Sequence, residues 1–130
     1  MTSLTFNGRV SSGKSEAARF IALPWVASQI EKKLGFAAYP GTLNIKLSRS
    51  ETVKLERLKK ARTMEIAPAE GFCRGKLFKA RIDNSVQCAV VIPEVESYPQ
   101  DVLEVIASTN LRQRLMLKDG DSVKVTVLLG

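Results

Sequence analysis

The eight residues from Gly8 to Ser15, GRVSSGKS, match the phosphate-binding pattern G-x-x-x-x-G-K-[ST]. In that pattern, backbone N–H groups surround a triphosphate, the Lys contacts its β and γ oxygens, and the Ser or Thr hydroxyl binds Mg²⁺. Lys14 and Ser15 would take these two roles here. The pattern therefore predicts nucleotide chemistry, on condition that a parallel strand precedes the loop and a long helix follows it.

A second group of polar residues, Thr42 and Asn44, lies in the segment YPGTLNIKL. Residues i and i+2 of a strand point to the same face, so these two neutral side-chain oxygens would lie side by side. Oxygen ligands of this kind suit Mg²⁺. The spacing alone is more typical of a hairpin whose turn is capped by a Thr and an Asn, so both interpretations stay open at this point.

The absence of histidine excludes His general bases, His-containing triads and His metal ligands. The two cysteines, Cys73 and Cys88, form neither a CxxC redox motif nor a zinc site, and their apolar surroundings predict buried thiols. A metal would therefore bind through oxygen ligands, which favours Mg²⁺ over zinc. The formal net charge of +7 favours an anionic partner, but it is equally typical of solvated Lys and Arg side chains.

The length of 130 residues, with 45% hydrophobic and 25% charged residues, is typical of one globular domain. No apolar run approaches the ~20 residues of a membrane span. The N-terminal sequence MTSLTFNGRV lacks the pattern of a secretion signal. We therefore expect a single domain over residues 1–130, located in the cytoplasm and without a membrane partner.

The elements that must position these residues follow from hydrophobic periodicity. Apolar residues at every fourth position after Pro24 predict a helix over about 24–34 that stops at Gly35. Shorter helices are predicted over PQDVLEVIA and over NLRQRLM, the latter with Thr109 as its N-cap. Period-two alternation predicts strands over 4–10, 43–47, 75–82, 86–93 and 122–129, while RFIAL and VKLERLKK fit either a strand or a helix. About six short strands with two or three helices indicate a mainly β fold, closed as a small barrel.

These elements disagree with the architecture of a P-loop. Only eight residues separate Ser15 from Pro24, and proline cannot continue a helix interior, so no long helix fits after the loop. The chain also lacks the strand–helix alternation of a parallel sheet and an apolar strand that ends in Asp. Lys14 and its small neighbours still predict a phosphate-binding loop of another kind.

Three separated segments resemble the archaeal CTP-dependent riboflavin kinases: the YPGTLN box, the LEVIA segment and NLR…LKDGD, in this order. With GRVSSGKSEAARFIALPW, the resemblance covers nearly the whole chain except about 48–72. It implies a six-stranded cradle-loop β-barrel with short connecting helices over 1–130, without the N-terminal helix-turn-helix domain that some members carry. It also implies transfer of the γ-phosphoryl group of CTP to the ribityl 5′-hydroxyl of riboflavin, which gives FMN and CDP.

The resemblance further implies which residues bind the metal and the nucleotide. Thr42 and Asn44 would hold Mg²⁺, the metal of the reaction. The nucleotide would contact two segments, one in the loop after the first strand and one at the start of a short helix. These positions are Gly13, Lys14, Ser15, Glu16, Ala17 and Ala18, followed by Thr109, Asn110, Leu111, Arg112, Gln113 and Arg114.

The flavin-contacting positions implied by the resemblance are Glu96 and Glu104. Family members usually carry a Thr where Glu96 stands, and a carboxylate cannot donate a hydrogen bond at neutral pH, so Ser97 is an alternative contact. Glu104 is also the acidic candidate for a general base, with an exposed position on the helix predicted over PQDVLEVIA as the other interpretation. Lys14 and Arg112 are candidates for stabilising the developing charge, or solvated residues of a loop and a helix.

Two other functions stay open from the residues alone. A P-loop triphosphatase is one. The other is a nucleic-acid-binding module, because LRQRLMLKDGDSVKV also resembles the helix–turn–strand unit of small-barrel transcription factors. The chain lacks the interleaved aromatic residues of single-strand binders, and this reading leaves the TLN box unexplained. We therefore expect riboflavin and CTP as substrates and no nucleic-acid partner. The oligomeric state stays open, with a monomer as one option.

Overall fold

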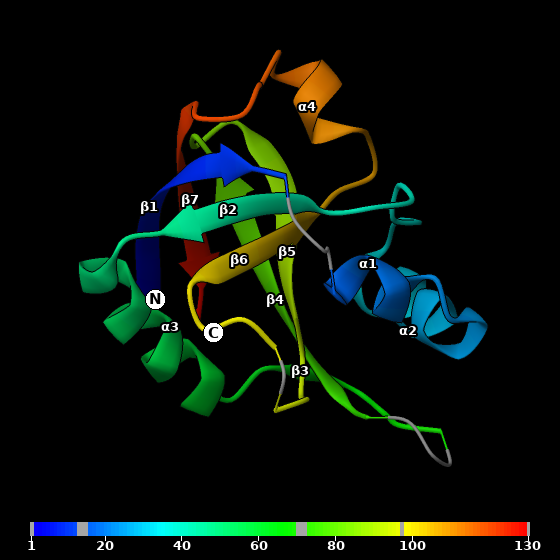
Figure 1. Ribbon diagram of the computed structural model, residues 1–130. Coiled ribbons are helices and arrows are strands. Elements are labelled where there is room, and N and C mark those ends of the chain that lie inside the picture. The colour runs from blue at the N-terminus through cyan, green and yellow to red at the C-terminus, as the bar shows by residue number, and fades with distance from the viewer. Residues whose placement is uncertain (1, 13–15, 70–72, 97, 130) are drawn as a thin grey trace.

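The computed structural model describes residues 2–12, 16–69, 73–96 and 98–129 (Figure 1). Within these ranges the chain forms seven strands and four helices. None of these helices is long and apolar enough to cross a membrane. The strands are β1 (Ser3–Ser11), β2 (Leu43–Leu47), β3 (Met64–Ile66), β4 (Gly75–Ile82), β5 (Val86–Pro93), β6 (Val102–Ile106) and β7 (Ser122–Leu128); the helices are α1 (Glu16–Ile21), α2 (Pro24–Leu34), α3 (Arg49–Lys60) and α4 (Leu111–Arg114).

Antiparallel pairings join six of these strands into a closed ring. The neighbours run β4-β5-β6-β2-β1-β7, and β7 pairs back onto β4. The ring closes because one edge of β4 pairs with two different strands. Residues 75–77 of β4 pair with β3, and residues 80–82 pair with β7. The mainly β prediction is confirmed. The strand count exceeds the expected six because the short β3 extends the sheet beyond the ring (Figure 1).

Alternate residues of the strands fill the interior of the ring. On β1, the buried residues Leu4, Phe6 and Val10 alternate with polar residues that face outward. Nearly every residue of β5 is buried, because α1 packs against this strand. Cys88 lies on β5, and its burial raises the pKa of the thiol to about 12. The prediction of a buried thiol is thus confirmed for Cys88, whereas Cys73 is half-buried.

Close packing of β1 against β2 requires a glycine at position 8. Gly8 pairs with Leu47, and a Cβ on Gly8 would lie 2.5 Å from Ile45 Cγ2 and 2.7 Å from the backbone oxygen of Lys46. Non-bonded carbon atoms are most stable about 3.5–4.0 Å apart, so any side chain here would push the strands apart. The first glycine of GRVSSGKS therefore serves strand packing inside β1.

The elements around the phosphate-binding pattern are not those of a P-loop. The preceding strand β1 has antiparallel neighbours on both sides, β2 and β7. The following helix α1 has only six residues, and α2 begins at Pro24 as predicted. Gly35 ends α2 in the left-handed conformation at φ 81°, and its N–H donates to the Glu31 carbonyl. The prediction against a P-loop architecture is confirmed.

Some predicted elements are wrong in type or boundary. Residues 102–106, expected within a helix, form β6 between β2 and β5. Both faces of β6 are largely buried, so VLEVI lacks the alternation by which a strand is recognised. Asn110, not Thr109, caps α4, because its side-chain oxygen accepts the Gln113 N–H at 3.2 Å. The ambiguous segment VKLERLKK is helical within α3, and RFIAL begins in α1.

Candidate functional site

Three polar side chains meet where β2 pairs with β6. Asn44 of β2 lies opposite Glu104 of β6 in the strand register, and Thr42 immediately precedes β2. The hydroxyl oxygen of Thr42 lies 3.4 Å from Asn44 Oδ1 and 2.6 Å from Glu104 Oε1. The prediction that the oxygens of Thr42 and Asn44 lie side by side is therefore confirmed.

Glu104 is a buried strand residue, so its interpretation as an exposed helical position is wrong. Only 2% of its surface is exposed. Its Oε1 accepts the Thr42 hydroxyl, and its Oε2 accepts the Tyr98 hydroxyl and the Ala17 N–H, both at 2.9 Å. A buried carboxylate requires such donors, because burial removes its hydration. Sequence analysis missed Tyr98, since nothing in its local pattern indicates a buried hydroxyl partner.

The oxygens of Thr42 and Asn44 fit a small divalent cation. Adjacent ligands of an octahedral Mg²⁺ lie about 3.0 Å apart when each is about 2.1 Å from the ion. The observed 3.4 Å separation needs an adjustment of only a few tenths of an ångström. The part of the chain that the structure describes contains no cluster of three or more His, Cys, Asp or Glu side chains that could hold a metal. The side-chain oxygens of Thr42 and Asn44 are neutral donors of the kind that a hard cation accepts, and they lie next to the Glu104 carboxylate.

A cavity of about 130 Å³ opens beside Thr42. One wall is the turn and strand start at Tyr39–Leu43, and the other comes from β6 and the segment before α4. The Tyr39 N–H donates to the Ala107 carbonyl at 2.8 Å, which holds the two walls together. Residues 109–112 also line the cavity, so one predicted metal ligand, Thr42, and part of the predicted nucleotide segment border the same space.

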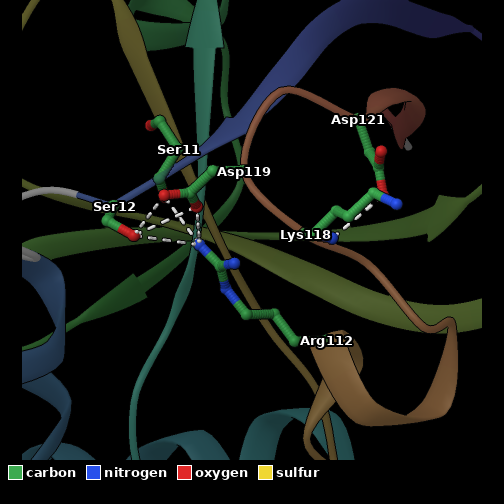
Figure 2. A network of polar contacts seen from close by, with 6 residues as sticks. All are labelled: Ser11, Ser12, Arg112, Lys118, Asp119 and Asp121. Carbon is green, nitrogen blue, oxygen red and sulfur yellow. Dashed lines mark hydrogen bonds and ion pairs between the residues drawn. The ribbon is translucent and has the colours of Figure 1, made fainter.

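Arg112 belongs to a polar network that joins the end of β1 to α4 and to the turn before β7 (Figure 2). Its guanidinium donates to Asp119 Oδ1 at 2.7 Å, to the Ser11 carbonyl at 3.1 Å and to the Ser12 hydroxyl at 3.4 Å. Ser12 in turn donates to both oxygens of Asp119. The hydrogen bonds from Arg112 and then from Ser12 hold the pKa of Asp119 below its usual value. Arg112 is thus anchored beside the cavity and is not a freely solvated helix residue.

The remaining predicted site residues lie elsewhere or outside the described ranges. Gly13, Lys14 and Ser15, together with Ser97, fall outside those ranges. Of the rest, Ala17 is fully buried with its N–H on Glu104, while Gln113 and Arg114 of α4 are exposed. Of residue 16 only the backbone is described, at the start of α1, and Ala18 is half-buried beside Ala17.

Glu96, the other predicted flavin contact, is exposed and lines a separate groove of about 330 Å³. Lys59, Lys76 and Tyr98 also line this groove. The structure therefore does not bring Glu96 into the cavity beside Thr42. Tyr98 connects the two regions, because it lines the groove while its hydroxyl reaches Glu104.

Several curated sequences similar to this chain come from archaea. A riboflavin kinase of Pyrobaculum aerophilum is 43% identical over 139 residues, covering 99% of this chain and 63% of the relative. One from Archaeoglobus fulgidus is 40% identical over 133 residues, covering 97% of this chain and 55% of the relative. One from Methanobrevibacter smithii is 34% identical over 122 residues, covering 94% of this chain and 98% of the relative. The chain thus spans about three-fifths of the first two relatives and nearly all of the third.

A family model covers most of the same region. Residues 10–127 match the model CTP-dep_RFKase, described as "Domain of unknown function DUF120". The matched range includes Thr42, Asn44 and Glu104, together with the residues of the Arg112 network. The resemblance noted in the sequence is therefore confirmed, and the chain belongs to the CTP-dep_RFKase family.

Proposed function

We propose that this chain is a CTP-dependent riboflavin kinase, which transfers the γ-phosphoryl group of CTP to the ribityl 5′-hydroxyl of riboflavin and releases FMN and CDP. The observation that carries the proposal is the convergence of Thr42 with residues 109–112 around one cavity. Membership of the family supports it, as do the relatives named riboflavin kinase. On this proposal the strand ring is the cradle-loop β-barrel of the family, and residues 1–130 form its kinase domain.

The metal in this proposal is Mg²⁺, held by the hydroxyl of Thr42 and the amide oxygen of Asn44. When bound, Mg²⁺ supplies charge neutralisation on the phosphate oxygens, which is the main requirement of phosphoryl transfer. Both protein ligands are neutral, so neither of them neutralises the charge of the ion, and the phosphate oxygens would complete its oxygen ligands. Of these two residues, Thr42 also lines the cavity, so an ion held there would lie next to the space that residues 109–112 border.

Phosphate contacts are assigned to the loop at residues 13–18 and to residues 109–114. Arg112 is the charged residue of the second segment that lines the cavity, and Asp119 and Ser12 hold its guanidinium in place. A pre-oriented guanidinium costs little reorganisation when charge develops on a transferring phosphoryl group. Lys14 is assigned the corresponding role in the first segment.

We assign the flavin to the groove lined by Glu96 and Tyr98, because the Tyr98 hydroxyl contacts Glu104. The groove at Glu96 has about 330 Å³, which lies within the usual size range of small-molecule sites. Tyr98 leads from this groove to Glu104, which lies 2.6 Å from the Thr42 hydroxyl. We therefore place the ring system in the groove and direct the ribityl chain toward Glu104. A dissociative transition state asks little of a general base, so none is assigned.

One assay tests the proposal directly. The protein is incubated with Mg²⁺, riboflavin and CTP, ATP, GTP or UTP in parallel, and flavins and nucleotides are separated by chromatography. We expect FMN and CDP in equal amounts with CTP, much less product with the other nucleotides, and none after chelation of the metal by EDTA. Failure to form FMN with any of the four nucleotides would overturn the proposed function.

A further inference from the structure

The carboxylate of Glu104 is buried without a cationic partner among the described residues. Its three hydrogen-bond donors are all neutral: the hydroxyls of Thr42 and Tyr98 and the N–H of Ala17. None of the ion pairs within the described ranges includes Glu104. Burial removes the hydration of a carboxylate, and an opposite charge nearby compensates for that loss. A cation next to Thr42 would provide that compensation.

The hydrogen bond between Thr42 and Glu104 determines which way the Thr42 lone pairs point. Thr42 carries one hydroxyl hydrogen and has two acceptors nearby, Glu104 Oε1 at 2.6 Å and Asn44 Oδ1 at 3.4 Å. The shorter contact lies in the range of charge-assisted O–H···O⁻ bonds, so the hydrogen points to Glu104. The lone pairs of the Thr42 hydroxyl oxygen then remain available to a cation, and the Asn44 oxygen lies 3.4 Å away.

The second oxygen of Glu104 is fixed from two directions. Tyr98, on the segment before β6, donates its hydroxyl to Oε2, and Ala17, in the first turn of α1, donates its N–H to the same atom. Tyr98 is only 5% exposed and Ala17 is fully buried, so bulk water does not compete for either hydrogen bond. The carboxylate therefore cannot rotate away from Thr42 without losing two buried hydrogen bonds.

We propose that Glu104 is the positioning residue of the metal site: it orients the Thr42 hydroxyl and supplies the negative charge that a divalent cation neutralises. This inference rests on the proposed function and deepens it, because it gives Glu104 a role beyond contact with the flavin. Tyr98 acts through Glu104 by holding its second oxygen. Mutation of a residue that hydrogen-bonds to a metal ligand typically lowers metal affinity by about 10- to 100-fold.

The substitution Glu104→Gln tests this role with little change in side-chain size. Glutamine can offer its oxygen to Thr42, but its NH₂ group would then face two donors, Tyr98 and Ala17. The matched control is Glu51→Gln on α3, another buried carboxylate, which accepts hydrogen bonds from the Asn7 N–H and from Lys54. Binding of Mn²⁺ to the protein–CDP complex is measured by electron paramagnetic resonance, and riboflavin binding by fluorescence in EDTA.

We expect Glu104→Gln to weaken Mn²⁺ binding about 10- to 100-fold, while Glu51→Gln leaves it unchanged. Tyr98→Phe, which removes the hydroxyl that donates to Glu104 Oε2, should weaken Mn²⁺ binding several-fold and keeps the test available if Glu104→Gln does not fold. Wild-type Mn²⁺ affinity in either variant would overturn the inference. If riboflavin phosphorylation by the wild-type protein is observed in that case, the proposed function stands and only the positioning role fails. If the wild-type complex binds no Mn²⁺, the proposed metal site and this inference fail together.

Discussion

Replacing Arg112 with alanine should weaken nucleotide binding and leave the fold intact. Its side chain borders the cavity that also contains Thr42, and its partner Asp119 lies in the exposed turn before β7. The two side chains are 36% and 58% exposed. An ion pair this accessible contributes little to stability, because water and salt screen it. We therefore expect the urea midpoint of Arg112→Ala to stay close to that of the wild type.

The expected loss in affinity for CDP follows from one charge-assisted contact to phosphate. Hydrogen bonds to charged groups contribute about 1.5–3 kcal/mol, which corresponds to roughly 10- to 150-fold in Kd. Arg112→Lys should fall between alanine and the wild type. All three hydrogen bonds to Asp119, Ser11 and Ser12 come from Nη2, and lysine keeps the positive charge but lacks the further N–H groups of the guanidinium.

Isothermal titration with CDP and Mg²⁺ at two salt concentrations measures the loss. Arg57→Ala is the matched control, because Arg57 is an exposed residue of α3 outside the cavity lining and its removal changes the net charge equally. The salt dependence of binding should decrease in Arg112→Ala and stay unchanged in the control. Equal CDP affinity in the two variants would refute the assignment of Arg112 to phosphate, and a large drop in the urea midpoint would refute its peripheral structural role.

Three other predictions separate the site from the scaffold. Asn44→Ala should lower riboflavin kinase activity by at least about 10- to 100-fold and raise the Mg²⁺ concentration needed for the half-maximal rate. Ser15→Ala should have little effect on either quantity. A large effect of Ser15→Ala and a small effect of Asn44→Ala in a Mg²⁺ titration would restore the P-loop interpretation. Gly8→Ala should lower the free energy of unfolding by about 1–3 kcal/mol because its Cβ would overlap β2, and the folded fraction should bind CDP normally; unchanged stability in urea denaturation would contradict the packing argument. Burial alone would raise the pKa of Glu51, but the hydrogen bonds from Lys54 and Asn7 outweigh it and lower the pKa, so its contribution to stability is full above the unfolded pKa of about 4.3 and is lost as pH falls through the folded value. Glu51→Gln should therefore flatten the decline of stability between pH 5 and pH 3 in denaturation experiments, and an unaltered decline would exclude this carboxylate as its source.

Local signals in the sequence were sufficient to predict an element where one of its faces is buried or where a proline or glycine marks its end. Pro24 and Gly35 define both ends of α2, because proline fits the first turn of a helix and glycine adopts the left-handed conformation at its end. The i, i+2 spacing placed Thr42 and Asn44 side by side, because strand geometry has a period of two. The ordered boxes around these residues indicated the family.

Tertiary structure alone decided the rest of the site. The segment VLEVI does not show the alternation typical of a strand, because both of its faces are covered. Glu104 is a buried acceptor because α1 and Tyr98 pack around it. The network of Arg112 likewise joins residues about 100 positions apart, across the ends of β1 and α4. By itself the amino-acid sequence determined which residue types could bind a cation and a phosphate. Closure of the strand ring decided which of them meet, because contacts between distant segments leave no periodic pattern along the chain.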